Sequence, residues 1–244
     1  MYSFLLIGQS NMAGRGNPKE VEPIKNDRIY QLRNGRWQNM FVPVNPDRAF
    51  SGVSLAESFA DCVSRFYGVD VGLIPCADGG TTLEHWKKGD LLYSNAIYQA
   101  RLAARTSKIA GVLWHQGESD CADGKHQLYI EKCTDIFEGI KEELGLLDVP
   151  FLVGGLGSFL ADSDENGKNY FLVNEALKQM EKRNDYIGFV SAEELTANPD
   201  NLHFNARSLR VFGERYFEKF KCMNKIIEGN SEKFDARLSA IELL

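Results

Sequence analysis

The chain has 244 residues, which fits one large α/β domain or two small ones, and the lack of a linker-like stretch favours one domain. Hydrophobic residues make up 43% and charged residues 25%, a composition that excludes a chain disordered throughout. The 34 acidic residues outnumber the 28 lysines and arginines, and the sequence has no basic run. Nucleic-acid binding is therefore excluded as a function, because it requires clustered positive charge.

The sequence pattern also argues against a membrane span. The longest apolar stretch, Val149–Ala161, is broken by three glycines and is shorter than the roughly 20 residues that a span requires. The apolar run Tyr2–Ile7 has no basic region before it and no small-residue cleavage site after it, so we interpret it as a strand rather than an export signal. We expect a cytoplasmic protein.

The cysteines support the same location. They are odd in number, widely spaced and free of any C-x-x-C pair: Cys62, Cys76, Cys121, Cys133 and Cys222. This pattern is typical of reduced, structural thiols in a cytosolic protein.

Short β-rich apolar runs alternate with helix-period segments along most of the chain. The runs typical of buried parallel strands are Ser3–Ile7, Val69–Cys76, Ile109–His115, Val149–Gly154 and Ile187–Ser191. The segments with helical periodicity are Ser54–Phe66, Leu92–Thr106, Lys125–Leu144, Phe171–Asn184 and Ala206–Phe220. The first helix starts with a capping-box pattern at Ser54 and Glu57. Five strands joined by helical crossovers predict an α/β fold, a three-layer α/β/α sandwich around a five-stranded parallel sheet.

Two regions interrupt this alternation. Residues Gly14–Phe50 hold four of the seven prolines, and the Asn34-Gly35 pair within them predicts a hairpin with a type I′ turn. Because this insertion follows the first strand, we expect it at the end of the sheet where ligands bind. Residues 223–244 form a candidate helical extension to a main domain of residues 1–222. That extension packs either on the domain or on a second copy of the chain, as in a homo-oligomer.

Four clusters of polar residues follow the predicted strands. They are Gly8–Gly16 after the first strand, Asp78–Thr82 after the second, Gln116–Asp120 after the third and Pro199–His203 after the fifth. The carboxyl ends of parallel strands share one edge of the sheet, where sites form in α/β proteins. Four polar clusters at one edge exceed what turns require, so we predict a functional site there.

The residue types in these clusters suit acyl transfer. A serine hydroxyl needs a neighbouring imidazole to take its proton, and the imidazole needs an acid to fix its tautomer. Ser10 lies at a tight strand-to-helix turn, His203 is the candidate base, and Asp200 is close enough along the chain to reach it. The backbone amides of Ser10 and Gly80 and the side-chain amide of Gln116 are candidate donors to the oxyanion.

Four sequence blocks resemble those of a known superfamily. Gly8–Met12, Gly79–Thr81, Trp114–Glu118 and Asp200-x-x-His203 occur in the order found in SGNH hydrolases. More narrowly, the blocks resemble the sialate O-acetylesterase and acetylxylan esterase branch, the sixth carbohydrate-esterase family. The resemblance spans roughly Tyr2–Cys222.

This resemblance implies a flavodoxin-like fold and hydrolysis of O-acetyl esters on a sugar. By the same resemblance, Ser10, His203 and Asp200 form the catalytic triad, and the oxyanion hole is made by Ser10, Gly80 and Gln116. The chain departs from the broad superfamily at Gln116, where asparagine is usual. The resemblance to this branch also leaves open which carboxylate orients His203, because Glu118 is an alternative to Asp200.

Several residues are candidates for binding the sugar. Trp37 and Trp86 either stack on a pyranose or are half-buried in the domain. Arg15 either binds a substrate hydroxyl or carboxylate or pairs with an acid on its own loop. His85 either lines the mouth of the site or lies on an exposed loop. The polar residues expected at the mouth indicate a small acyl group.

Other classes of protein are weighed against the esterase. A non-catalytic sugar-binding domain keeps the fold but not the triad, and a lipase or thioesterase of the same superfamily needs a wide apolar groove. A flavodoxin-like flavin or nucleotide binder is a third class. No H-E-x-x-H or paired-cysteine pattern occurs, so we expect no metal, and we expect no other cofactor.

Overall fold

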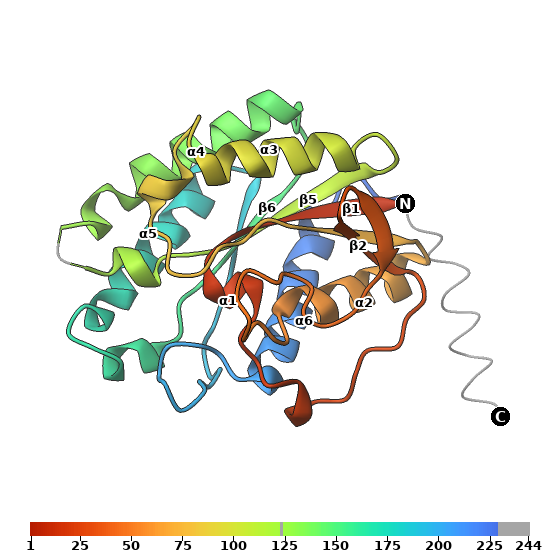
Figure 1. The fold of residues 1–244 in the computed structure, drawn as a ribbon. Helices are drawn as coiled ribbons and strands as arrows, with labels where there is room; N and C mark the ends of the chain where they lie inside the picture. The colour runs from red at the N-terminus through yellow and green to blue at the C-terminus, as the bar shows by residue number, and fades with distance from the viewer. Residues whose placement is uncertain (123, 229–244) are drawn as a thin grey trace.

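The computed structural model describes residues 1–122 and 124–228. A central sheet is covered by helices on both faces (Figure 1). The strands are β1 (Tyr2–Gly8), β2 (Ile29–Arg33), β3 (Arg36–Asn39), β4 (Val71–Pro75), β5 (Lys108–His115), β6 (Phe151–Gly154) and β7 (Ile187–Val190). The helices are α1 (Ser10–Ala13), α2 (Leu55–Tyr67), α3 (Leu91–Ala103), α4 (Tyr129–Leu144), α5 (Tyr170–Arg183) and α6 (Ala206–Met223).

The sheet has seven strands instead of the five predicted, in the order β3-β2-β4-β1-β5-β6-β7. The five predicted strands are all present and mutually parallel. Counted among themselves, they follow the order 2-1-3-4-5, which is the flavodoxin-like arrangement. The predicted three-layer α/β/α class is therefore confirmed, and the predicted strand count was too low by the two strands of the insertion.

The two additional strands are the arms of the predicted hairpin. Asn34 and Gly35 both have positive φ, 52° and 75°, as a type I′ turn requires, so the turn prediction is confirmed. β2 pairs in parallel with β4, with Ile29 opposite Val71, and β3 pairs antiparallel with β2 at the edge. The sequence predicted the hairpin but not its neighbour, because only the tertiary fold brings β2 beside β4.

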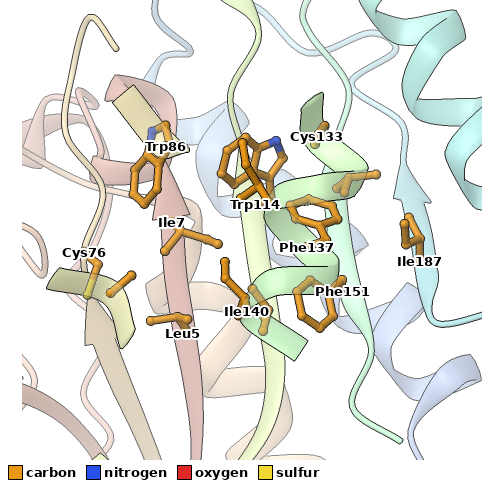
Figure 2. Packing of buried hydrophobic residues seen from close by; sticks show 14 of the residues in the cluster. Leu5, Ile7, Cys76, Trp86, Trp114, Cys133, Phe137, Ile140, Phe151 and Ile187 are labelled. Carbon is orange, nitrogen blue, oxygen red and sulfur yellow. The ribbon is translucent and has the colours of Figure 1, made fainter. Parts of the chain in front are cut away.

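Two apolar cores lie on opposite faces of the sheet. In β1, Phe4 and Leu6 belong to the core under α2 and α6, whereas Leu5 and Ile7 belong to the core under α3, α4 and α5. Figure 2 shows the second core, which includes Phe137 of α4. Because both faces of the central strands are buried, these strands are continuous apolar runs in the sequence.

The helix boundaries follow local signals and packing. At the start of α2, the Ser54 amide donates to the Glu57 carboxylate at 3.0 Å and the Ser54 hydroxyl accepts from the Ala56 amide at 3.2 Å, which confirms the capping box. The helix predicted from Lys125 begins as α4 only at Tyr129. No residue of the preceding short turn, His126–Leu128, is buried, so packing does not extend the helix to that point.

The predicted C-terminal extension, residues 223–244, lies mostly outside the described residues, which end at Glu228. Helix α6 itself ends at Met223. None of the helices within residues 1–122 and 124–228 combines the length and apolar character needed to cross a bilayer.

Helices α2 and α6 lie against the same face of the sheet (Figure 1) and touch closely at Gly213. A Cβ atom at Gly213 would lie 2.2 Å from both the Leu55 carbonyl oxygen and Ser58 Oγ, and 2.8 Å from the Phe59 amide nitrogen. Two of these three atoms belong to the backbone of α2. The contact between the helices therefore leaves no room for a side chain at this position.

We expect Gly213→Ala to destabilise the protein by about 1–3 kcal/mol, as overpacking of a rigid contact does. Helix propensity alone predicts the opposite sign, a gain of about 1 kcal/mol. Urea-induced unfolding measures the difference, with Glu214→Ala on the exposed side of α6 as the control. A Gly213→Ala variant more stable than the parent would contradict this packing.

Candidate functional site

The predicted polar clusters converge on one cavity of about 390 Å³. It lies at the carboxyl ends of β1, β4 and β5, where the chain order of the sheet reverses, as expected for an α/β site. Its wall is formed by Gln9, Ser10, Arg15, Arg48, Phe50, Gly79, Gly80, Glu118, Ser119, Ala122, Asp164, Asn166, Leu202 and His203. All four clusters predicted from the sequence, including the one before α6, contribute to it.

Ser10 is placed by the turn between β1 and α1. Gly8 has a φ of 127°, and a Cβ atom there would lie 2.1 Å from the carbonyl oxygen of His115. Glycine is therefore required for β1 to end so close to β5. The Gln9 amide then donates to the same carbonyl at 2.8 Å, and Ser10 begins α1 at the wall of the cavity.

His203 lies between Ser10 and Asp200. Its Nε2 is 2.9 Å from Ser10 Oγ, and its Nδ1 is 2.7 Å from Asp200 Oδ2. Burial alone would raise the pKa of Asp200, but hydrogen bonds from the amide and ring of His203 and from the Leu202 amide lower it overall. Because the ionised carboxylate only accepts, Nδ1 carries the hydrogen and the Nε2 lone pair faces the Ser10 hydroxyl.

The second candidate acid, Glu118, has different partners. Its Oε1 accepts a hydrogen bond from Asn11 Nδ2 at 2.5 Å and lies 3.4 Å from Nδ1 of the buried His115. The pKa of His115 is lowered by burial, against the opposing effect of the Glu118 charge. Of the two acids that the sequence left open, Asp200 is therefore the one that contacts the ring of His203.

Asn11 is a site residue to which the sequence reasoning gave no role. Its Nδ2 donates to the Leu202 carbonyl at 3.2 Å as well as to Glu118, and its Oδ1 accepts from the Phe204 amide at 3.0 Å. Asn11 thus holds the residues on either side of His203. Its position directly after Ser10 was the available signal.

Two residues of the cavity wall have backbone amides with no hydrogen-bond acceptor among the described residues. Within the described part of the chain, neither the Ser10 nor the Gly80 amide donates a hydrogen bond. Gly80 has a φ of 78°, a conformation that glycine adopts readily. The neighbouring Gly79 amide, in contrast, donates to Asp47 Oδ2 at 2.9 Å. Both amides predicted as oxyanion donors are therefore at the wall and available.

Gln116 does not lie where the sequence predicted it. Its side chain is fully buried and is not part of the cavity wall. Its Nε2 lies 2.5 Å from Asp120 Oδ2, 3.1 Å from the Thr81 carbonyl and 3.2 Å from Gln9 Oε1. With its two hydrogens used inside the protein, Gln116 supports Gln9 and the Thr81 loop instead of donating to a ligand.

Trp86 is not a sugar platform, because it is fully buried (Figure 2). Its ring packs edge-on against Trp114 with centroids 5.6 Å apart, and its Nε1 donates to Thr81 Oγ1 at 3.2 Å. Trp86 ends a short 3₁₀ helix, Leu83–Trp86, and its indole is part of the core under α3 and α4. The sequence left open stacking on a sugar or half-burial in the domain; stacking is wrong for Trp86, and its burial is complete instead of partial.

Trp37 and His85 also lie outside the cavity wall. Trp37 is on β3 at the sheet edge, where its ring covers Gly72 and its Nε1 donates to Thr106 Oγ1 at 3.0 Å. His85 is exposed, and its Nδ1 accepts from the Thr82 amide at 3.1 Å. The structure therefore does not place either residue against a sugar in this cavity.

Arg15 lines the cavity but is paired within the protein. Its guanidinium bonds Asp47 in two places, Nη1 to Oδ1 at 3.0 Å and Nη2 to Oδ2 at 2.7 Å. Burial would raise the pKa of Asp47, but hydrogen bonds from Arg15, Ser51 and the Gly79 amide lower it overall. Sequence reasoning missed Asp47 and its neighbours Arg48 and Phe50, because no spacing pattern marks them.

Comparison with known proteins extends over nearly the whole chain. A "probable carbohydrate esterase" of Arabidopsis thaliana is 29% identical over a match of 231 residues, with a coverage of 84% for this chain and 84% for that protein. An X-ray structure of an Arabidopsis thaliana protein superposes with a TM-score of 0.83 at 25% identity, covering 91% of this chain and 98% of that one.

More distant structures share the fold. NanS has a TM-score of 0.73 at 17% identity, covering 91% of this chain and 96% of its own. A carbohydrate acetylesterase from Xanthomonas citri has a TM-score of 0.69 at 21% identity, covering 91% of this chain and 55% of that one.

The three-layer fold and the ordered sequence blocks around one cavity occur in a chain whose family model is that of an esterase. A family profile described as "carbohydrate esterase, sialic acid-specific acetylesterase" matches residues 1–222. The chain belongs to this family of carbohydrate esterases, and the resemblance inferred from the four blocks is confirmed.

We expect Asn11→Ala to destabilise the protein by about 1–3 kcal/mol, the cost of leaving a buried polar group without a partner. The group in question is the amide of Phe204, a residue with no exposed surface. Urea-induced unfolding measures the loss. The matched control is Asn39→Ala, at an exposed position of β3. Equal stabilities of the two variants would show that Asn11 does not hold this loop.

Proposed function

We propose that the protein is a serine acetylesterase that removes O-acetyl groups from a sugar through Ser10, His203 and Asp200. The observation that carries this proposal is a chain of contacts that starts at the cavity wall, 2.9 Å from Ser10 Oγ to His203 Nε2, and continues 2.7 Å from His203 Nδ1 to Asp200 Oδ2. This arrangement meets the geometric requirement for an activated nucleophile and an oriented base.

In the first half of the reaction, Ser10 Oγ attacks the acetyl carbonyl carbon while His203 Nε2 takes the hydroxyl proton. The negative charge that develops on the carbonyl oxygen is held by the amides of Ser10 and Gly80, which have no other partner among the described residues. Collapse of the tetrahedral intermediate breaks the ester bond. The sugar oxygen leaves with the proton from His203, and the acetyl group stays on Ser10.

In the second half, water attacks the acetyl-serine. His203 accepts a proton from the water, and the same two amides stabilise the second oxyanion. The intermediate then releases acetate, and the proton returns from His203 to Ser10 Oγ. Asp200 remains ionised throughout and holds the imidazole ring of His203. Its lowered pKa is consistent with this role: burial would raise the pKa, but the hydrogen bonds from His203 and Leu202 outweigh that effect.

The cavity wall favours a short acyl group on a polar alcohol. Among the described residues of the wall, three have apolar side chains: Phe50, Ala122 and Leu202. A lipase or thioesterase needs a continuous apolar surface for its acyl chain, whereas polar groups are suited to the hydroxyls of a sugar. This composition supports acetyl esters of carbohydrates as the substrate class.

We expect Ser10→Ala to lower kcat by at least ~10⁴-fold, as removal of a triad nucleophile does. Acetate release from acetylated xylose, acetylated glucose and p-nitrophenyl acetate measures the loss. Ser94→Ala, at an exposed position on α3, is the matched control. A sugar-binding protein without catalysis would bind the acetylated sugar and release no acetate in either variant, and retained turnover in Ser10→Ala would exclude Ser10 as the nucleophile.

A comparison of Asp200→Asn with Glu118→Gln tests which carboxylate orients the ring of His203. Asp200→Asn removes the acceptor that fixes the tautomer of His203, so kcat should fall about 10⁴-fold. Glu118→Gln keeps an oxygen that accepts from Asn11, so we expect less than a tenfold loss. Steady-state kinetics on p-nitrophenyl acetate compares the two variants. A deeper loss in Glu118→Gln than in Asp200→Asn would assign the role to Glu118.

A further inference from the structure

The two arginines of the cavity wall are both neutralised by carboxylates of the protein. Arg15, whose side chain is 5% exposed, is held by both oxygens of Asp47. Arg48 reaches Asp78 Oδ1 at 2.9 Å and the Gly79 carbonyl at 3.0 Å with Nη2, and its Nη1 donates to the Asp47 carbonyl at 2.8 Å. Each guanidinium thus has an acidic partner before any substrate enters.

The remaining charges of the wall are acidic. Glu118 and Asp164 line the cavity, and the Glu118 side chain is 3% exposed. Its Oε2 is buried and has no hydrogen-bond partner among the described residues. With Asp47 and Asp78 behind the two arginines, the described surroundings of the cavity hold more carboxylates than guanidinium groups. A sugar carboxylate placed here would meet no unpaired cation within the described residues.

Phe50 supplies an aromatic surface at the same cavity. It is 70% exposed and is the only one of the exposed large apolar side chains of the described residues that belongs to the wall. The guanidinium carbon of Arg15 lies 5.3 Å from the centre of its ring. Because Arg15 is buried, it supports one face of the ring, and the exposure of Phe50 leaves the other face to solvent.

We propose that this cavity selects an uncharged acetylated pyranose over a carboxylated one, with the apolar face of the sugar on Phe50. The inference rests on the proposed esterase function and names its substrate class. Phe50 thus provides the stacking surface for the sugar that the sequence analysis sought in Trp37 and Trp86. An aromatic ring and the C–H face of a pyranose both bury apolar surface when they stack.

The first test compares three acetyl esters: an acetylated methyl xyloside, an O-acetylated sialic acid and p-nitrophenyl acetate, which has no sugar. We expect kcat/KM for the xyloside to exceed that for the sialic acid at least tenfold, at equal ionic strength. Equal values, or a preference for the sialic acid, would overturn the proposal. Loss of Ser10-dependent turnover on all three esters would instead overturn the esterase function.

The second test uses Phe50→Ala. We expect KM for the acetylated xyloside to rise about tenfold, a larger rise than that for p-nitrophenyl acetate, and Phe50→Tyr to restore the parental KM. The matched control is Phe41→Ala, an exposed phenylalanine of the same insertion that stacks on Arg33 and lies outside the wall. An unchanged KM in Phe50→Ala, or an equal rise in Phe41→Ala or on p-nitrophenyl acetate, would overturn the role of Phe50.

The third test weakens the pairing of Arg48 with its carboxylate partners. Asp78→Asn keeps the size of the side chain but removes the nearer of two carboxylates beside Arg48, at 2.9 Å, and leaves Asp47 Oδ2 at 3.9 Å. The charge of Arg48 is then less neutralised when a substrate carboxylate enters. We expect the ratio of kcat/KM for the sialic acid to that for the xyloside to rise at least about threefold, as the loss of a partly exposed ion pair allows. An unchanged or lower ratio would show that pairing of Arg48 does not set the charge preference.

Discussion

The geometry of the site depends on the side-chain amide of Asn11, which joins the beginning of the chain to its end. Asn11 is next to Ser10 on α1, and it bonds the carbonyl of Leu202 and the amide of Phe204. His203 lies between those two residues. The Ser10 to His203 contact spans 193 positions of sequence. The Asn11 amide, which donates on one side and accepts on the other, holds these two segments together, and Asn198 Nδ2 adds a hydrogen bond to the Arg15 carbonyl at 3.1 Å.

Asn11 acts on a frame set by the sheet. β1 lies between β4 and β5, so its carboxyl end faces the loops of both neighbours. The close approach at Gly8 brings Ser10 beside the residues that follow β5, and the β4 loop supplies Gly80 from the other side. The proposed nucleophile, the two proposed oxyanion donors and the loop of the proposed base therefore meet because the central strand ends at the point where the chain order reverses.

The sequence allowed much of this to be predicted where the signal was local. Buried parallel strands are apolar runs, Ser54 with Glu57 marked a helix start, and Asn34-Gly35 marked a turn. The assignments that failed depend on tertiary direction. Nothing local shows that the Trp86 ring is directed into the core or that Gln116 faces Asp120 instead of the cavity. The position of a residue after a predicted strand does not determine whether its side chain points into the core or into the cavity.

The insertion after β1 contacts both the loop of Gly79 and Gly80 and the charged side chains of the cavity wall. Asp47 neutralises Arg15 and also accepts from the Gly79 amide, which fixes the residue before Gly80. A change at Arg15 or Asp47 that alters substrate charge preference therefore also disturbs the proposed oxyanion donor. Phe50 has no polar side-chain atom and takes part in neither of these hydrogen bonds; its ring lies against the Arg15 guanidinium. Substrate range can thus vary at Phe50 while the buried pair and the chemistry it supports stay fixed.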